Sequence, residues 1–228
     1  MSKPILPELH QLLFEDLLRH ALLEDLGRAG DVTSDAVVEH DLRARARIIA
    51  REPCRVSGGP VAAMAFHLLD PKAEVVHRTA DCDDADAGDV LLEVMGRARS
   101  LLSAERTAIN LLARLCGIAT LTRRYVDTIA GTGAWIYDTR KTMPGYQRLE
   151  KYAVRCGGGC NHRIGLSDAV LIKDNHLAFG RQASGEQRFA PAEAVSAARQ
   201  FLAATLSAEE AERMIVEIEV DTLLQLAD

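Results

Sequence analysis

The change of pattern after Gly131-Thr132-Gly133 constrains the fold of this 228-residue chain more than any other feature. From that point short apolar runs alternate with helical stretches, which is typical of βα units around a parallel sheet. The predicted strands cover 134–138, 169–173 and 214–220, and the predicted helices cover 145–155, 191–206 and the residues from 222 onward. A closed βα barrel needs about eight such units and typically ~250 residues. We therefore expect an α/β barrel truncated after its third strand, with an open sheet covered by helices as the alternative.

The first half of the chain mixes helices and strands without that regular alternation. The predicted helices cover 7–26, 60–69 and 100–130, and the predicted strands cover 43–56, 73–79 and 89–98. The run GDVTSD at 30–35 predicts a turn, and so does the acidic run between the last two strands. For the long helix we expect Ser100 or Ser103 as the N-cap and Gly117 as a weak point, and we expect this helix to bridge two domains.

The composition excludes several classes of protein. The formal net charge of −6 and the pI near 5.7 lack the general basic field of a nucleic-acid binder, so any anion site must be local. The chain shows neither a secretory leader nor an apolar run approaching ~20 residues, so we expect no membrane partner and a cytoplasmic location. Five cysteines are an odd number and predict reduced thiols. Cys156, Cys160 and His162 lack a fourth partner for a structural zinc site, so we predict no metal there.

Charged residues follow the first predicted strand of the second half. The apolar run ends at Asp138, and Thr139, Arg140 and Lys141 come next. In βα enzymes the active site lies at the C-terminal ends of the parallel strands. An arginine can hold a carboxylate or phosphate through two parallel hydrogen bonds, and a lysine acts as a mobile point charge. The run indicates a local anion site, although a solvated strand exit is the alternative for this run alone.

A second group of cations surrounds the next predicted strand. His162 and Arg163 follow three glycines at 157–159, which allow close backbone approach or positive φ and could present amides to an anion. Lys173 closes the apolar run 169–172 and therefore also lies at a strand end. These residues strengthen the prediction of an anion site, because they add cations at a second strand end.

The third predicted strand of this half carries two carboxylates. Glu217 and Glu219 stand at i and i+2, on one face of an otherwise apolar strand. Burying them unpaired would be costly. We expect them to pair with Lys141 or Lys173 or to stabilise developing positive charge, with a structural carboxylate pair as the alternative.

Five segments of the chain resemble the quinolinate phosphoribosyltransferase family. They are GDVTSDA at 30–36, SAERTAINLL at 103–112, TRKTMPG at 139–145, EKYAVRCGGGCNHRIGLSDAVLIKDNH at 150–176 and IVEIEVDTLLQL at 215–226. The match covers most of the chain, and its central motif is long and specific. The resemblance implies an N-terminal α+β sandwich domain over 1–115, a TIM-like α/β barrel domain over 116–228, and a homodimer in which one subunit's N-terminal domain covers the other's barrel mouth.

The resemblance also implies roles for individual residues. The substrate-binding set is Arg106, Thr139, Arg140, Lys141, His162, Arg163, Lys173 and Glu219. Within it, Arg106 matches an arginine contributed across the dimer interface, and Lys141, Lys173 and Glu219 are the expected catalytic residues. Lys141 and Glu219 match positions near 5-phosphoribosyl 1-pyrophosphate and its Mg²⁺, which we expect to be held mainly by substrate phosphates and water.

The implied reaction joins quinolinate to 5-phosphoribosyl 1-pyrophosphate and releases pyrophosphate and CO₂, giving nicotinate mononucleotide for NAD biosynthesis. Three alternatives stay open from the sequence. They are a non-catalytic metabolite-binding or dimerisation module, the molybdenum-transport-associated homologue of the same fold, and a Schiff-base barrel enzyme that uses Lys173 or Lys141 as its nucleophile. Anionic substrates explain the many neighbouring cations better than a Schiff base does.

Overall fold

A computed structural model describes residues 9–180 and 189–227 of the chain. By its internal contacts the chain divides into two compact units, Met1–His162 and Arg163–Asp228, which are described separately below. Among the described residues, no helix is both long enough and apolar enough to cross a membrane.

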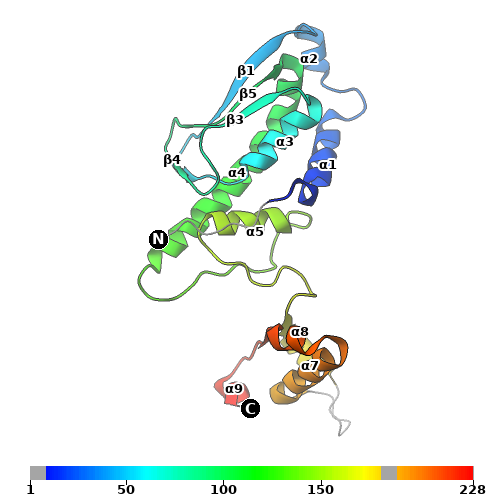
Figure 1. Cartoon of the computed structure of the whole chain (residues 1–228), viewed down its shortest axis with the longest axis vertical. Helices are drawn as coiled ribbons and strands as arrows, with labels where there is room; N and C mark the ends of the chain where they lie inside the picture. Colours follow the sequence, from blue (N-terminus) through cyan, green and yellow to red (C-terminus); the bar gives the residue numbers. More distant parts are fainter. Residues whose placement is uncertain (1–8, 181–188, 228) are drawn as a thin grey trace. The chain divides into compact units, whose positions relative to one another are not determined.

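The sheet of the first unit contains three antiparallel strands in the order β1-β5-β3 (Figure 1). They are β1 (Arg43–Ile49), β5 (Val90–Arg97) and β3 (Glu74–His77), and two shorter strands, β2 (Cys54–Arg55) and β4 (Asp84–Ala85), pair with each other. The prediction of one continuous strand over 43–56 is wrong. The register shifts between Ile48 and Ile49, and the chain leaves the sheet before Pro53, which has no backbone N–H to donate.

A layer of helices packs against this sheet (Figure 1). The long helix α4 (Ala98–Thr128) lies beside α3 (Gly59–Leu69), and α1 (Glu15–Leu26), which follows the short 3₁₀ helix η1 (Gln11–Leu13), contacts both. The core between the layers is apolar; among its least exposed members are Leu18, Val56, Val61, Leu92, Val94 and Leu115. The predicted helices 60–69 and 100–130 are confirmed, and the helix expected over 7–26 begins later, with residues 1–8 outside the described part.

The run GDVTSD forms a helix, α2 (Val32–Val37), where a turn was predicted. Asp31 is its N-cap, and its carboxylate accepts from the Ser34 N–H at 3.0 Å and from the Ser34 hydroxyl at 2.5 Å. These hydrogen bonds lower the pKa of Asp31. A turn and a helix N-cap use the same residue types. Here the hydrogen bond from the Ser34 N–H in the first turn to Asp31 stabilises the helix.

The start of α4 also differs from expectation. The N-cap is Arg97, which makes no side-chain cap hydrogen bond. The Ser100 hydroxyl instead donates to the Leu69 carbonyl at 3.3 Å, and the Ser103 hydroxyl donates to Asp31 Oδ2 at 3.0 Å. Gly117 does not interrupt the helix. Packing along its length therefore outweighs the weak propensity of one glycine.

The last helix of this unit is α5 (Gln147–Cys156), which packs against α4. The expected strand over 134–138 is reduced to one isolated parallel bridge between Tyr137 and Cys160. A single bridge gives little pairing, but it fixes the direction of the two segments relative to each other.

The second unit contains a parallel pair, β6 (Val170–Ile172) and β7 (Val216–Ile218). The helices around it are α6 (Asp174–Phe179), α7 (Pro191–Thr205), α8 (Ala208–Arg213) and α9 (Leu223–Ala227). Buried Ile172, Leu177 and Ala194 form its small core. The parallel pairing and α7 confirm the predicted βα pattern, whereas α6 and α8 were not predicted. The described residues contain no closed barrel.

Candidate active site

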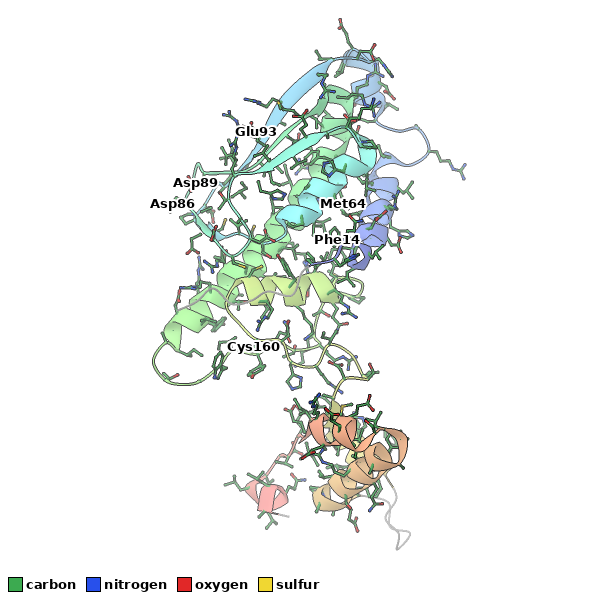
Figure 2. The ribbon with its side chains drawn as sticks, viewed as in Figure 1. Phe14, Met64, Asp86, Asp89, Glu93 and Cys160 are labelled. Carbon is green, nitrogen blue, oxygen red and sulfur yellow. The ribbon has the colours of Figure 1, made fainter. Side chains whose placement is uncertain are left out.

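Two segments of the first unit run parallel and carry cations where they end. The Asp138 N–H donates to the Cys160 carbonyl at 3.0 Å, and the Cys160 N–H donates to the Ile136 carbonyl at 2.8 Å. Figure 2 labels Cys160 on the strand-like segment below α5. Because the bridge is parallel, the residues that follow each segment emerge at the same end. The runs 139–141 and 161–162 are therefore neighbours in space.

A buried carboxylate joins these two segments. Asp138 Oδ1 accepts from Lys151 Nζ at 2.5 Å and from the His162 N–H at 2.9 Å, and its Oδ2 accepts from Asn161 Nδ2 at 2.6 Å. Lys151 Nζ also donates to the His162 carbonyl at 3.3 Å. The side chains of Asp138 and Lys151 are only 7% and 4% exposed, so this ion pair is shielded from water.

Exposed cations follow this junction. The Thr139 hydroxyl accepts from the Lys141 N–H at 3.0 Å, which turns the chain just after Asp138. The side chains of Arg140 and Lys141 are exposed, and neither has an ion-pair partner among residues 9–180 and 189–227. Two unneutralised cations at the end of a parallel-paired segment can receive an anionic ligand.

The three glycines at 157–159, before His162, pack against neighbouring residues, and their N–H groups make hydrogen bonds at the end of α5. A Cβ on Gly157 would lie 2.4 Å from the Ala119 carbonyl oxygen, and one on Gly159 would lie 2.9 Å from Thr122 Cγ2. The N–H groups of residues 157–159 donate to carbonyls of α5 at 3.0 Å each. The close-approach prediction is confirmed, and the suggestion that these amides face an anion is wrong.

In the second unit, Lys173 and Glu219 meet at the ends of β6 and β7. Lys173 Nζ lies 2.9 Å from Glu219 Oε2, so the predicted pairing of this lysine with a strand carboxylate is confirmed. Both Glu217 and Glu219 are exposed, which removes the expected desolvation cost of burying them. The His176 Nδ1 atom accepts from the Lys173 N–H at 2.9 Å and thereby caps α6.

Arg163 opens the second unit and is partly buried. One of its terminal nitrogens donates to the Ala169 carbonyl at 3.4 Å. Its Nε–H is buried and has no hydrogen-bond partner in the described part of the chain. A buried guanidinium N–H without an acceptor is an unusual cost for a protein, and a hydrogen bond to an anion would remove it.

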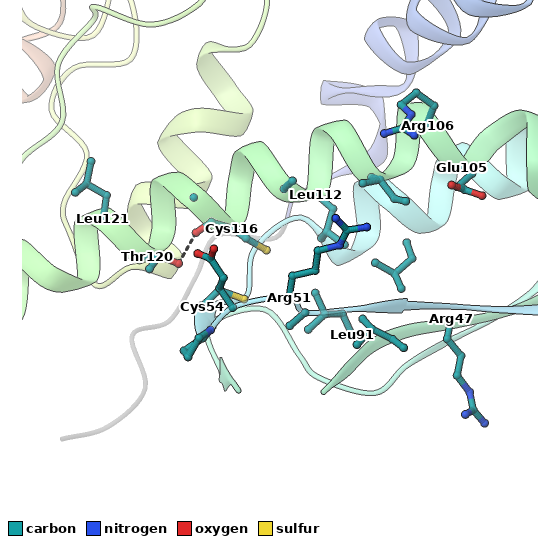
Figure 3. Close-up of a pocket in the computed structure, with 18 of the residues that line it drawn as sticks. Arg47, Arg51, Cys54, Leu91, Glu105, Arg106, Leu112, Cys116, Thr120 and Leu121 are labelled. Carbon is teal, nitrogen blue, oxygen red and sulfur yellow. Dashed lines mark hydrogen bonds between the residues drawn. The ribbon is translucent and has the colours of Figure 1, made fainter. Parts of the chain in front are cut away.

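Arg106 is exposed on α4 and is one of the residues that line a groove of about 970 Å³ between this helix and the β1–β2 segment. Figure 3 shows its side chain on the side of α4 away from Arg51 and Leu91. Arg47, Arg51 and Arg124 also line the groove, and its floor includes Leu91 and Leu112. Arg106 makes no ion pair with any described residue, and the groove residues do not include Arg140, Lys141 or His162. Arg106 also lines a second groove, of about 710 Å³, with Arg114 and Met143, and within one chain neither groove brings it to Arg140, Lys141 or His162.

The five cysteines are free thiols. Burial raises the pKa of Cys116 to about 12, and contact with the Cys82 thiol, together with burial, raises the pKa of Cys156. These thiols are therefore protonated and poorly suited to nucleophilic chemistry. No group of three or more His, Cys, Asp or Glu side chains with metal-binding geometry occurs among the described residues.

Lys151 and Asn161 were not predicted as site residues. Lys151 follows the buried Leu149 and Glu150 on α5, and a charged residue in a helix normally reads as solvent-facing. Its partner Asp138 is distant in sequence, so no local spacing links them. The only sequence signal for this pair was that an apolar run ends in Asp138. A carboxylate at the end of such a run requires a partner if the carboxylate is buried.

Comparison with known proteins identifies relatives over both halves of the chain. Residues 31–116 match the family model described as quinolinate phosphoribosyl transferase, N-terminal domain, and residues 118–228 match that described as its C-terminal domain. Nicotinate-nucleotide pyrophosphorylase [carboxylating] of Mycobacterium leprae (strain TN) is 42% identical over 213 residues, covering 92% of this chain and 69% of the relative. The probable enzyme of that name from Bacillus subtilis (strain 168) is 43% identical over 75% of this chain and 58% of the relative.

Solved structures agree with this assignment. The nicotinate-nucleotide pyrophosphorylase from Francisella tularensis superposes with a TM-score of 0.82 at 34% identity, covering 96% of this chain and 71% of that one. The chain thus spans between about three fifths and seven tenths of the length of these relatives. Its two-domain α/β fold and its sequence place the chain in the quinolinate phosphoribosyltransferase family.

Proposed function

We propose that this protein transfers the phosphoribosyl group of 5-phosphoribosyl 1-pyrophosphate to quinolinate, with decarboxylation, to give nicotinate mononucleotide, pyrophosphate and CO₂ in NAD biosynthesis. The names of its relatives support the reaction. The observation that carries the proposal is the pair of unneutralised cations, Arg140 and Lys141, beside His162 in a protein of net charge −6. A dianionic substrate requires such a local concentration of positive charge.

The residue types suit the chemistry of both substrates. The family resemblance assigns Arg140, His162, Arg163 and Lys173 to quinolinate, whose two carboxylates suit cationic and hydrogen-bonding partners, and it adds the Thr139 hydroxyl to this set. Attack of the pyridine nitrogen on the ribose C1 breaks the bond to pyrophosphate and builds positive charge on the sugar, which Glu219 would stabilise. Loss of CO₂ then leaves its electron pair on the ring carbon, where the adjacent positive nitrogen stabilises it until a proton from water takes the place of the lost carboxylate. No protein nucleophile is needed.

Lys141 and Glu219 would serve the phosphate-bearing substrate. Each side chain is exposed at the end of its own segment and can therefore contact a ligand. A single exposed carboxylate fits Mg²⁺ that is held mainly by substrate phosphates and water, since Mg²⁺ keeps several waters and needs few protein ligands. When bound, Mg²⁺ would neutralise charge on the departing pyrophosphate.

Arg106 is proposed to act in a homodimer. Its exposed side chain has no ion-pair partner among the described residues, and the groove beside it carries three further arginines. A second copy that places its cation set against this groove would complete the quinolinate site with Arg106.

We also propose that residues 1–115 form the α+β sandwich, that β6 and β7 belong to an α/β barrel within 116–228, and that the protein acts in the cytoplasm.

Paired arginine variants test this proposal. Arg140→Ala should lower kcat/KM for quinolinate by about 30-fold or more, because truncating one partner of a charge-assisted contact costs at least ~2 kcal/mol. Arg148→Ala removes another exposed cation, on α5, and should leave kcat/KM within about twofold of the wild type. If the wild-type protein turns over quinolinate and Arg140→Ala does so with an unchanged kcat/KM, the proposed role of this site would be contradicted.

A further inference from the structure

Three consecutive residues of α5 make polar contacts with three different segments of the first unit. Glu150 accepts from Arg114 Nε of α4 at 3.0 Å, Lys151 pairs with Asp138, and the Tyr152 hydroxyl donates to Asp81 Oδ2 at 2.8 Å. The Lys151 ammonium contacts both cation-bearing segments at once, through the Asp138 carboxylate and the His162 carbonyl.

Stability alone gives a poor reason for this buried lysine. Taking an ammonium and a carboxylate out of water costs about as much as their attraction returns, so apolar side chains of similar volume often serve a core equally well or better. A hydrogen-bonded ion pair does, however, fix the positions of the groups it joins. At Asp138 the two carboxylate oxygens are shared among Lys151, Asn161 and the His162 backbone.

We propose that Lys151 is a positioning residue, which holds the segment carrying Arg140 and Lys141 at a fixed spacing from His162. This inference rests on the proposed function and adds to it a residue that does not touch substrate. Without the ammonium, the buried Asp138 carboxylate keeps only its two amide-type donors and gains by rotating toward water. That rotation moves residues 139–141 relative to 162, and the cations then no longer match the spacing of the two carboxylates on quinolinate.

Lys151→Met tests the proposal, with Tyr152→Phe as the matched control. Both variants remove a buried polar contact of α5, but Tyr152→Phe breaks its link to Asp81 and leaves the Asp138 junction intact. We expect Lys151→Met to raise KM for quinolinate by about tenfold to a hundredfold, and to raise KM for 5-phosphoribosyl 1-pyrophosphate as well, because Lys141 lies on the displaced segment. Tyr152→Phe should leave both KM values within about twofold. A purely structural loss would lower kcat by reducing the folded fraction and would move neither KM.

Hydrogen exchange gives a readout that is independent of turnover. Peptides covering 138–142 and 160–162 should exchange faster in Lys151→Met than in the wild type, whereas Tyr152→Phe should affect peptides near 57–59 and 81 instead. If the two variants change hydrogen exchange as expected but the wild-type protein does not turn over quinolinate, the proposed function fails, whereas the coupling of Lys151 to the two segments stands.

Unchanged exchange at 138–142 and 160–162 in Lys151→Met, or an unchanged KM for quinolinate, would overturn the proposal. If Lys151→Met fails to fold, Asp138→Asn replaces it, because the amide keeps the shape of the side chain and one acceptor oxygen. It should then show the same rise in KM for quinolinate and the same faster exchange, and the absence of either would overturn the proposal.

Discussion

Gly157→Ala is expected to destabilise the first unit by forcing α5 away from α4. The backbone of Gly157 has φ −74° and ψ −4°, which alanine adopts freely, so the cost comes from space alone. The added Cβ would lie 2.4 Å from the Ala119 carbonyl oxygen and 2.6 Å from Thr122 Cβ, whereas ordinary contacts begin at 3.4 Å. The segments must therefore separate by about 1 Å (3.4 − 2.4), and overpacking of this kind typically costs about 1–3 kcal/mol.

Gly117→Ala is the matched control for this change. Gly117 lies inside α4, and a Cβ added there would meet nothing within 4 Å, so alanine should stabilise by roughly 0.5–1 kcal/mol. Urea unfolding followed by far-ultraviolet circular dichroism measures both variants, and their free energies of unfolding should differ by roughly 1.5–4 kcal/mol. A Gly157→Ala variant as stable as the wild type would refute the close approach of α5 to α4.

Three further predictions concern polar and thiol groups of the first unit. Arg114→Met should cost about 1–3 kcal/mol, because it leaves the buried Glu150 carboxylate without its cation. The Arg97 N–H donates to Asp70 and lowers the pKa of that carboxyl, so Asp70→Asn should destabilise most near pH 6, and the difference from wild type should shrink below about pH 4. With its thiol pKa raised to about 12, Cys116 should react with iodoacetamide at pH 8 about a thousandfold more slowly than a free cysteine.

Each of these predictions has a distinct refutation. Urea unfolding of Arg114→Met that matches the wild type would show that Glu150 is solvated. For Asp70, the sign follows from a folded pKa below the unfolded one, so its stabilisation is lost on acidification; a difference that grows below pH 4 would contradict this. Mass spectrometry that finds Cys116 alkylated as fast in the folded protein as in urea would show that the thiol is not buried.

The strand ends and their cations were predictable from the sequence because their signals are local. An apolar run ending in a charged residue identifies both the strand and its exit, and this placed Lys173 and Glu219 at neighbouring ends of a parallel pair. The same reasoning overestimated the strand at 134–138, which pairs only at Tyr137. Strand pairing depends on a partner segment, and an apolar run does not report whether that partner is long enough.

The buried ion pair between Asp138 and Lys151 shows where sequence reasoning stops. Periodicity predicts which helical positions face a core when the core is apolar, but it assigns a lysine to solvent. Likewise, the roles of the glycines at 157–159 depended on which helix passes beside them, since the same residues suit an anion-binding turn or a close contact. Both questions are settled by tertiary contacts between segments distant in sequence.

The proposed reaction is tested by following the carboxylate that leaves quinolinate. Quinolinate labelled with ¹⁴C in its 2-carboxylate is incubated with the protein, 5-phosphoribosyl 1-pyrophosphate and MgCl₂, and released ¹⁴CO₂ is compared with nicotinate mononucleotide formed. We expect one CO₂ for each nucleotide, and no nucleotide when nicotinate replaces quinolinate, because nicotinate lacks the second carboxylate that the cation set requires. Equal turnover of nicotinate, or nucleotide without labelled CO₂, would contradict it.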